Sequence, residues 1–181
     1  MKTIYTLGAI ALAAASFATA AKNPVVGGNE MFPAKNIVQN AVNSADHTTL
    51  VAAVKAAGLV DTLSGPGPFT VFAPVNAAFA KLPAGTVDTL LKPENKEMLT
   101  KVLTYHVVAG KWSAMDLKKM IRKAGGTAEL KTVSGGTLKA MVHSNMIVLH
   151  DEKGGMSTVT QADVFQSNGV IHVVDTVVLP N

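Results

Sequence analysis

Residues 70–83 read TVFAPVNAAFAKLP and pass from a strand through a turn into a helix. The side chains of residues 69–73 alternate between the two faces of an extended chain, as they do in any strand. Pro74 has no N–H to donate and is therefore expected to end the strand. Asn76 is a favourable N-cap for the short apolar helix that follows, and Pro83 is expected to end that helix. The stretch holds no catalytic residue, which argues against an enzyme.

Residues 1–20 are predicted to be a secretory signal peptide that is cleaved from the mature chain. Lys2 supplies the positive start, residues 4–18 are apolar and small, and an Ala-Thr-Ala end fits the small-x-small cleavage pattern. The apolar run is shorter than the ~20 residues of a membrane span, so no integral span is expected in the mature protein. Residues 21–32 follow as an expected extended lead-in, and residues 33–181 as a single domain. We therefore expect a secreted protein, either periplasmic or extracellular.

The charge and the aromatic content of the chain argue against a nucleic-acid-binding function. The net charge is +4, and removal of the one lysine in the expected signal peptide leaves +3. This mildly basic balance permits weak attraction to acidic surfaces but is far from the basic footprint of a nucleic-acid binder. Aromatic residues make up 5% of the chain, too few for a base-stacking platform. No nucleic-acid partner is expected.

The pattern of reactive residues predicts no metal, no cofactor and no catalytic set. The chain has no cysteine, which excludes disulfides and thiolate metal sites. Its five histidines show neither the His-x-x-x-His nor the His-Glu-x-x-His spacing of a zinc site. A Gly-x-Ser-x-Gly nucleophile elbow and a phosphate-binding loop are also lacking. We therefore expect a non-enzymatic protein.

Helical patterns come first along the chain and strand patterns come last. Helices are expected from Pro33, over 46–63 with an interruption at Gly58, over 86–91, from Pro93, and over 113–123. Extended segments are expected over 105–108, 129–133, 137–142, 146–150, 159–165 and 170–179. The last of these is apolar on both faces, which is typical of a central, buried strand. This order of elements predicts an α+β domain rather than alternating βαβ units.

Three segments together resemble the fasciclin domain family: TVFAPVNAAFAKLP, LTYHVVAGK at residues 103–111, and GVIHVVDTVVLP at residues 169–180. They follow the family's order and spacing, and the similarity runs from residue 33 to the C-terminus. The resemblance implies an α+β wedge of antiparallel β-sheets with a cluster of helices packed on one side. It also implies a secreted, non-enzymatic adhesion or interaction module that binds a protein or glycan of a cell surface, matrix or envelope. One departure lies in the first segment, where Val75 and Ala77 replace a Thr and a Glu that the family often has.

Four residues are candidates for contact with a partner through the same resemblance. Asp163 and Val164 occupy the position of an Asp-aliphatic pair that animal family members use for integrin contact. Tyr105 and His106 match a Tyr-His pair that has been linked to adhesion in the family. The residues themselves favour a structural role for His106, as a hydrogen-bonded histidine in a half-buried strand. Tyr105 likewise has a large apolar body and one hydroxyl to place.

Six further residues are expected to serve the scaffold: Phe72, Pro74, Asn76, Phe79, His172 and Asp175. Phe72 and Phe79 should pack in the core. His172 and Asp175 lie three positions apart in the expected last strand. Their side chains should therefore face opposite sides of the sheet and form no dyad.

A basic stretch lies in and before the helix expected over 113–123. Its cations are Lys111, Lys118, Lys119, Arg122 and Lys123. The expected role is a solvated helix face, with the cations placed favourably near the C-terminus of the helix. A weak site for acidic glycans or anionic membrane surfaces is the alternative.

Two other functions remain open from the sequence. A periplasmic carrier of a small ligand could use the eight methionines and the 48% apolar composition to line a pocket. A hydrolase could use His106 or His172 together with an Asp and a Ser.

Overall fold

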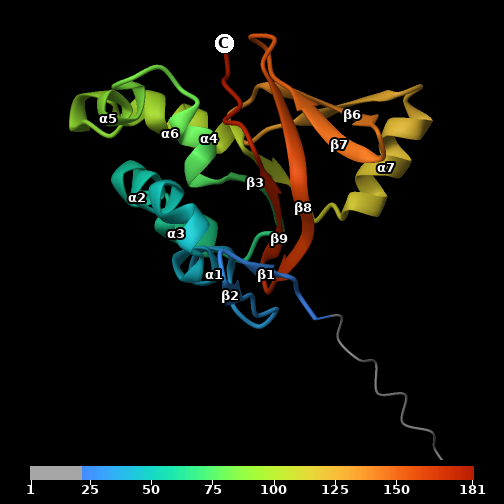
Figure 1. Cartoon of the computed structure of the whole chain (residues 1–181), viewed down its shortest axis with the longest axis horizontal. Coiled ribbons are helices and arrows are strands. Elements are labelled where there is room, and N and C mark those ends of the chain that lie inside the picture. Colours follow the sequence, from blue (N-terminus) through green and yellow to red (C-terminus); the bar gives the residue numbers. More distant parts are fainter. Residues whose placement is uncertain (1–21) are drawn as a thin grey trace, which may run out of the picture.

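A seven-stranded sheet runs through the middle of the molecule (Figure 1). The structure is a computed structural model, and it describes residues 22–181. The expected signal peptide, residues 1–20, lies outside the described residues. In their order across the sheet the strands are β4 (Val107–Ala109), β3 (Phe69–Pro74), β9 (Gly169–Val174), β8 (Met156–Gln166), β7 (Met146–His150), β6 (Thr137–His143) and β5 (Thr127–Lys131). Neighbouring strands are antiparallel except β3 and β9, which run parallel.

The helices gather mainly on one side of this sheet (Figure 1). They are α1 (Ile37–Asn43), α2 (Thr48–Ala57), α3 (Val60–Ser64), α4 (Asn76–Ala80), α5 (Thr86–Leu90) and α6 (Lys96–Tyr105), with 3-10 turns η1 (Ala45–His47) and η2 (Pro93–Asn95). The remaining helix, α7 (Ala114–Lys123), packs against β5 and β6 at the other end of the sheet. The predicted α+β wedge with a cluster of helices on one side is confirmed, with one parallel strand pair at its centre.

Strand β3 separates two hydrophobic cores. Val71 and Ala73 belong to the core beneath α1, α2 and α6, whereas Phe72 belongs to the core beneath α7. This division follows from the alternation of side chains along an extended chain. Pro74 is the last residue of the strand, and the predicted handover to a helix follows at Asn76.

Strand β9 lies between β3 and β8, and all six of its residues are buried. A side chain at Gly169 would overlap the backbone oxygen of Phe69, so glycine allows the two strands to approach. The predicted central strand is confirmed, but it ends at Val174 instead of residue 179. Val177 and Val178 are still buried, although they have left the sheet.

Tyr105 and His106 are not in a strand, contrary to the extended segment expected over 105–108. Tyr105 is the last residue of α6, His106 is the C-cap, and β4 begins at Val107. The apolar positions of α6 continue at helical spacing up to Tyr105, so burial of that helix face outweighs the local β-propensity of the sequence. Met98 of α6 is 60% exposed.

The residues before α1 form a small hairpin of β1 (Val25–Val26) and β2 (Asn29–Glu30). Val26 and Met31 are buried in the core beneath the helices. The side chain of Asn23 accepts a hydrogen bond from the backbone N–H of Phe165 at 2.9 Å and donates one to the carbonyl oxygen of the same residue. The expected lead-in therefore packs on the domain.

Candidate functional site

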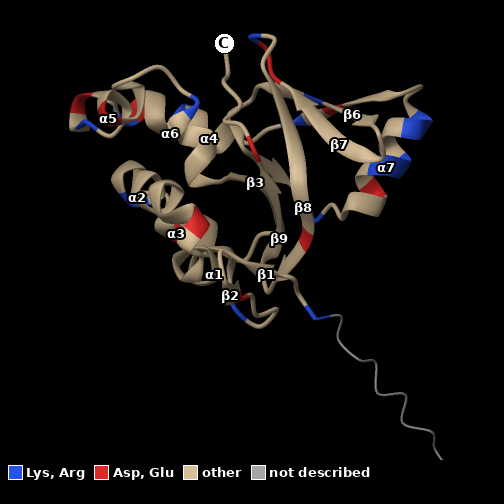
Figure 2. Cartoon of the chain, viewed as in Figure 1, with Lys and Arg blue, Asp and Glu red and all other residues tan. Residues whose placement is uncertain are grey.

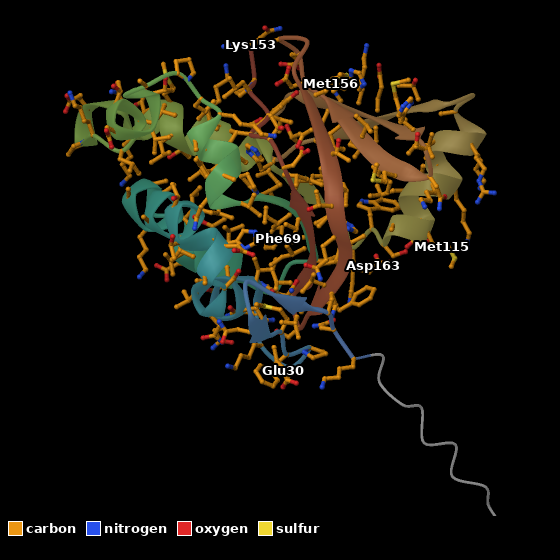
Figure 3. All side chains as sticks on the ribbon, viewed as in Figure 1. Glu30, Phe69, Met115, Lys153, Met156 and Asp163 are labelled. Atoms are coloured by element: carbon orange, nitrogen blue, oxygen red, sulfur yellow. The ribbon has the colours of Figure 1, made fainter. Side chains whose placement is uncertain are left out.

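Asp163 joins the sheet to the beginning of α7. It lies in an irregular part of β8, where the register with β9 shifts, and its φ of 60° is in the left-handed region. Its Oδ1 accepts a hydrogen bond at 2.7 Å from the N–H of Ala114, the first residue of α7 (Figure 3). The helix also has its own capping box between Ser113 and Asp116, at the start expected from the sequence. Two carboxylates and one hydroxyl therefore accept hydrogen bonds from the N–H groups of Ser113, Ala114 and Asp116 at the beginning of α7.

His172 lies directly beneath this junction and is fully buried. Its Nδ1 accepts the N–H of Asp163 at 3.3 Å, and its Nε2 donates to the carbonyl oxygen of Trp112 at 2.8 Å. The ring stacks on Phe72 with centroids 5.7 Å apart. Burial lowers the pKa of His172, so the neutral imidazole is the form that links β9, β8 and the segment before α7.

His106 occupies a similar position between α6 and the C-terminal segment. Its Nδ1 donates to the carbonyl oxygen of Val102 at 2.8 Å, and its Nε2 accepts the N–H of Val178 at 3.2 Å. Burial lowers its pKa to about 4. Both ring nitrogens are thus occupied by backbone groups.

The neighbouring Tyr105 is also fully buried and joins the beginning of β6 to the turn after β7. Its hydroxyl donates to the carbonyl oxygen of Thr137 at 2.7 Å and accepts the N–H of Glu152 at 3.3 Å. Burial raises the pKa of the phenol to about 12. Tyr105 is therefore a neutral hydrogen-bonding group near neutral pH.

The structure does not bring the four candidate contact residues together on a surface. Val164 is 1% exposed and packs in the core beneath the helices, while Tyr105 and His106 are 0% and 2% exposed. Asp163 alone among the four is partly exposed, and its carboxylate already binds α7. Direct contact of Val164, Tyr105 or His106 with a partner does not fit this placement, because their side chains face the interior.

Asn76 has a different role from the one expected. The N-cap of α4 is Val75, and the Asn76 side chain makes no bond to its own helix. Instead, its Oδ1 accepts the N–H of Thr49 at 3.0 Å and its Nδ2 donates to the carbonyl oxygen of Ala45 at 2.9 Å. Asn76 thus caps α2, and the expectation of a local cap was wrong because α2 lies within reach of the turn after β3.

Four other scaffold residues have packing or bonding roles. Phe72 is fully buried, Phe79 packs on the small cluster around Ala78 and Val102, and Pro74 closes β3. Asp175 follows β9 and accepts the N–H of Thr158 at 2.8 Å. The side chains of Asp175 and His172 therefore form hydrogen bonds to different partners.

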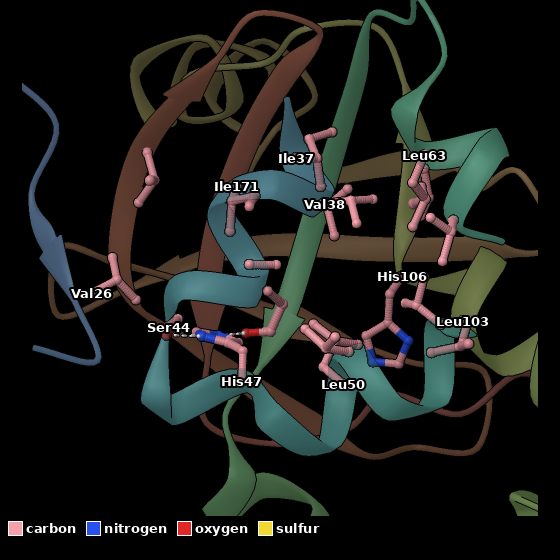
Figure 4. Close-up of a pocket in the computed structure, with 18 of the residues that line it drawn as sticks. Val26, Ile37, Val38, Ser44, His47, Leu50, Leu63, Leu103, His106 and Ile171 are labelled. Atoms are coloured by element: carbon pink, nitrogen blue, oxygen red, sulfur yellow. Dashed lines mark hydrogen bonds between the residues drawn. The ribbon is translucent and has the colours of Figure 1, made fainter. Parts of the chain in front are cut away.

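An apolar cavity of ≈ 50 Å³ lies between the helices and the sheet (Figure 4). His47 lies at one side, with its Nδ1 2.8 Å from the hydroxyl of Ser44 and its Nε2 3.4 Å from the carbonyl oxygen of Ala73. Among the described residues, Met31 is the one methionine in the lining. Small-molecule pockets usually measure at least ~300 Å³, so this cavity is too small for a carried ligand.

The basic residues of α7 face solvent at the far end of the molecule (Figure 2). Lys119, Arg122 and Lys123 are exposed, and Lys118 is half-buried with its Nζ 3.2 Å from Oδ1 of Asn145. Within residues 22–181, none of these cations lies within 4.0 Å of a carboxylate. We call Lys118, Lys119, Arg122 and Lys123 the basic face of α7. Lys111 is separate from it and lies over the ring of Phe165.

Two further features are absent from the described part of the chain. Residues 22–181 hold no group of three or more His, Cys, Asp or Glu side chains arranged to bind a metal ion. No helix in that part is both long and apolar enough to span a membrane.

Comparison with known proteins gives consistent matches. A family model of the fasciclin domain matches residues 45–180. Protein sll1483 of Synechocystis sp. is 46% identical over 178 residues, which cover 98% of this chain and 92% of that protein. Cell surface glycolipoprotein MPB83 of Mycobacterium bovis is 36% identical over 167 residues, which cover 89% of this chain and 68% of that protein. A solved FAS1 domain pair from the insect cell adhesion molecule Fasciclin I has a TM-score of 0.72 at 19% identity and covers 81% of this chain and 51% of that one.

Proposed function

Because the chain belongs to the fasciclin domain family, we propose that it is a secreted adhesion module that binds an acidic glycan or protein of a cell surface, matrix or envelope. The family is one of adhesion and interaction domains, generally without enzymatic activity. The partner meets the domain at the basic face of α7. Cleavage of residues 1–20 releases the mature chain to the periplasm or the medium.

The basic face of α7 is the observation that carries this proposal. Its cations are free of intramolecular ion pairs within residues 22–181, so their charge is available to an anionic partner. Asp163 contributes indirectly, because its bond to Ala114 fixes the end of α7 on the sheet. Of the four candidate contact residues, Asp163 is the one whose side chain holds the helix that carries the basic face.

The buried histidines support a non-enzymatic role. A general base needs a free ring nitrogen within reach of a substrate. His106 and His172 are 2% and 0% exposed, and each uses both nitrogens for backbone groups. Neither therefore supports the hydrolase considered from the sequence.

The name of one relative, cell surface glycolipoprotein MPB83, supports a location outside the cytoplasm. Sequencing the N-terminus of the native protein tests this part of the proposal. We expect the mature chain to begin at residue 21, in a periplasmic or culture-medium fraction. An uncleaved chain in the cytoplasm would contradict secretion.

Binding to immobilised sulfated glycan and to isolated cell envelopes tests the partner class. We expect binding that weakens as salt rises, because exposed charges are screened. The double variant Arg122→Glu, Lys123→Glu should bind at least about tenfold more weakly, since exposed ion pairs contribute up to about 1 kcal/mol each.

Lys55→Glu, Lys92→Glu is the matched control, because both lysines are exposed, lie on the opposite side of the molecule, and give the same change in net charge. Equal loss of binding in the two double variants would show a general charge effect and refute the basic face as the site. No binding of the wild-type protein to glycans, matrix proteins or envelopes would refute the adhesion function.

A further inference from the structure

The outer face of β6 and β7, which points away from α7, is exposed to solvent. Leu138 and Ala140 on the inner face are buried with Leu117 of α7, and side chains of the outer face alternate with them along β6. Two methionines and one histidine lie on this outer face near the β6–β7 turn: Met141, His143 and Met146. We call these three residues the thioether–imidazole cluster.

The strand register places the three side chains of the cluster next to one another. His143 lies directly opposite Met146, and Met141 is two positions from His143 on the same face of β6. Opposite side chains on a sheet have Cβ atoms about 5 Å apart, and diagonal ones about 7–8 Å. Met141 and Met146 are such a diagonal pair. All three side chains can therefore reach one point above the sheet.

The turn between the strands fixes this arrangement. Ser144 and Asn145 have φ of 49° and 67°, the left-handed pair of a two-residue type I′ hairpin. This tight turn sets the register of His143 and Met146 on either side of it. The cluster is thus placed by a rigid hairpin and not by a loop.

The side chains of the cluster are free to bind a ligand. Met141 and Met146 are 36% and 48% exposed, and His143 is exposed. Within the described part of the chain, the histidine side chains that form hydrogen bonds are those of His47, His106 and His172, so the imidazole of His143 has no such partner. Among the exposed methionines of the described residues, Met141 and Met146 are the two that lie diagonally opposite each other and on the same face as His143.

Two thioether sulfurs with one imidazole are a ligand set for a soft metal ion. Thioethers favour Cu(I), imidazole also accepts copper, and hard divalent ions prefer carboxylates. The cluster holds no carboxylate and no thiolate. We propose that Met141, His143 and Met146 form a binding site for monovalent copper on the outer face of the β6–β7 hairpin.

The other end of β7 shows why three ligands matter. His150 lies opposite Met156, which Figure 3 labels, so a second His–Met pair is present on the same face. Met141 is diagonal to His150 as it is to Met146, but Met156 lies one strand further from Met141, on β8, and Lys139 lies directly opposite His150 on β6. The positive charge of a nearby ammonium group disfavours the binding of a cation at this pair. The His150–Met156 pair should therefore bind Cu(I) more weakly than the cluster.

Competition with a chromogenic Cu(I) chelator, in the presence of a reductant and without oxygen, measures the affinity of the purified protein. We expect one ion per chain to be taken from the chelator. Ag(I), a redox-inert soft cation, then locates the site by NMR of the methionine methyl groups. The signals of Met141 and Met146 should shift, whereas those of Met98 and Met115 should not.

Substitution of single ligands completes the test. Met141→Leu, Met146→Leu and His143→Gln should each weaken Cu(I) binding at least about tenfold, since even residues that only orient metal ligands change affinity 10–100-fold. Met98→Leu and Met115→Leu are matched controls, because these side chains are 60% and 64% exposed, one on α6 and the other on α7, which covers the opposite face of the sheet from the cluster. Leucine keeps the volume of methionine, so the fold should survive each change.

Four outcomes would overturn the site. The chelator would retain all of the Cu(I), or Met98 and Met115 would shift with Ag(I) as much as the cluster, or all five single variants would bind equally. A shift confined to Met156 would also refute the cluster, because it would place the ion at the other end of β7.

Discussion

Asn76, the first residue of α4, accepts a hydrogen bond from the N–H of Thr49 at 3.0 Å and so caps α2, a helix that begins 28 positions earlier in the chain. The same side chain donates to the carbonyl oxygen of Ala45 in η1. One amide group therefore joins the turn after β3 to the beginning of the helical layer. Its position in the sequence suggests a local cap, but its partners make it a tertiary connection.

Replacing Asn76 by alanine should lower the free energy of unfolding by about 1–2 kcal/mol, as loss of a helix cap does. Denaturant unfolding measures this change, and hydrogen exchange locates it. We expect faster exchange of the Thr49 amide with little change in α4. Asn76→Asp keeps the acceptor for Thr49 and should be less destabilising. Faster exchange in α4 rather than at Thr49 would contradict the capping of α2.

Asp163 offers a test that separates a structural role from a contact role. Asp163→Asn keeps an oxygen that can accept the N–H of Ala114, and asparagine tolerates the positive φ of this position. Its stability should stay within about 1 kcal/mol of the wild type, which is the size of a helix-dipole contribution. Asp163→Ala loses the bond and strains the backbone, so it should destabilise by about 2 kcal/mol or more.

Binding measurements on the same two variants complete this test. Asp163→Asn should bind the sulfated glycan like the wild type, because the basic face of α7 is unchanged. Loss of binding in Asp163→Asn with an intact melting curve would instead assign the Asp163 carboxylate to the partner contact.

Local signals in the sequence were sufficient for much of the fold. The Ser113–Asp116 capping box places α7, and Gly58 ends α2 in the left-handed conformation that glycine readily adopts. The apolar run after Gly169 marks the buried strand β9. Each of these features depends on residues that are close together in the chain, so periodicity and capping chemistry reveal them.

The missed features depend on residues that are distant in the chain. The partners of Asn76 lie 27 and 31 positions away, and Ala114 lies 49 positions from Asp163. The burial of Val164 also follows from a change of register in β8 that no local pattern predicts. The strand register likewise brings Met141, His143 and Met146 to one face, although their spacing matches no metal motif.

Tyr105→Phe removes one hydroxyl and preserves the packing of the ring. The loss leaves the carbonyl oxygen of Thr137 and the N–H of Glu152 without this partner. The free energy of unfolding should fall by about 1–2 kcal/mol, the typical effect of removing a buried hydrogen-bonding group. Denaturant unfolding checks this value, and glycan binding should not change because the basic face of α7 lies elsewhere. Wild-type stability would show that the link between β6 and the turn after β7 does not depend on the hydroxyl.

The buried imidazole of His106 should make the protein less stable in mild acid. Its pKa is about 4 in the folded state and near 6.5 when unfolded, because burial penalises the charged form. Between these values the unfolded chain binds more protons, so the free energy of unfolding falls as the pH drops from about 6.5 to about 4. The loss from His106 is at most about 3 kcal/mol, at 1.36 kcal/mol per unit of pKa. Burial lowers the pKa of His47 and His172 as well, which adds to the same trend.

Urea unfolding of His106→Gln across this pH window isolates the contribution of one histidine. The variant should be less stable than the wild type at pH 7, because glutamine cannot reproduce both backbone bonds, yet it should lose less stability on acidification. Tyr105→Phe serves as a destabilised control, since it removes no group that titrates between pH 4 and 6.5, and its pH dependence should match that of the wild type. If His106→Gln and Tyr105→Phe lost stability equally on acidification, the imidazole of His106 would not be the neutral, buried link between α6 and Val178.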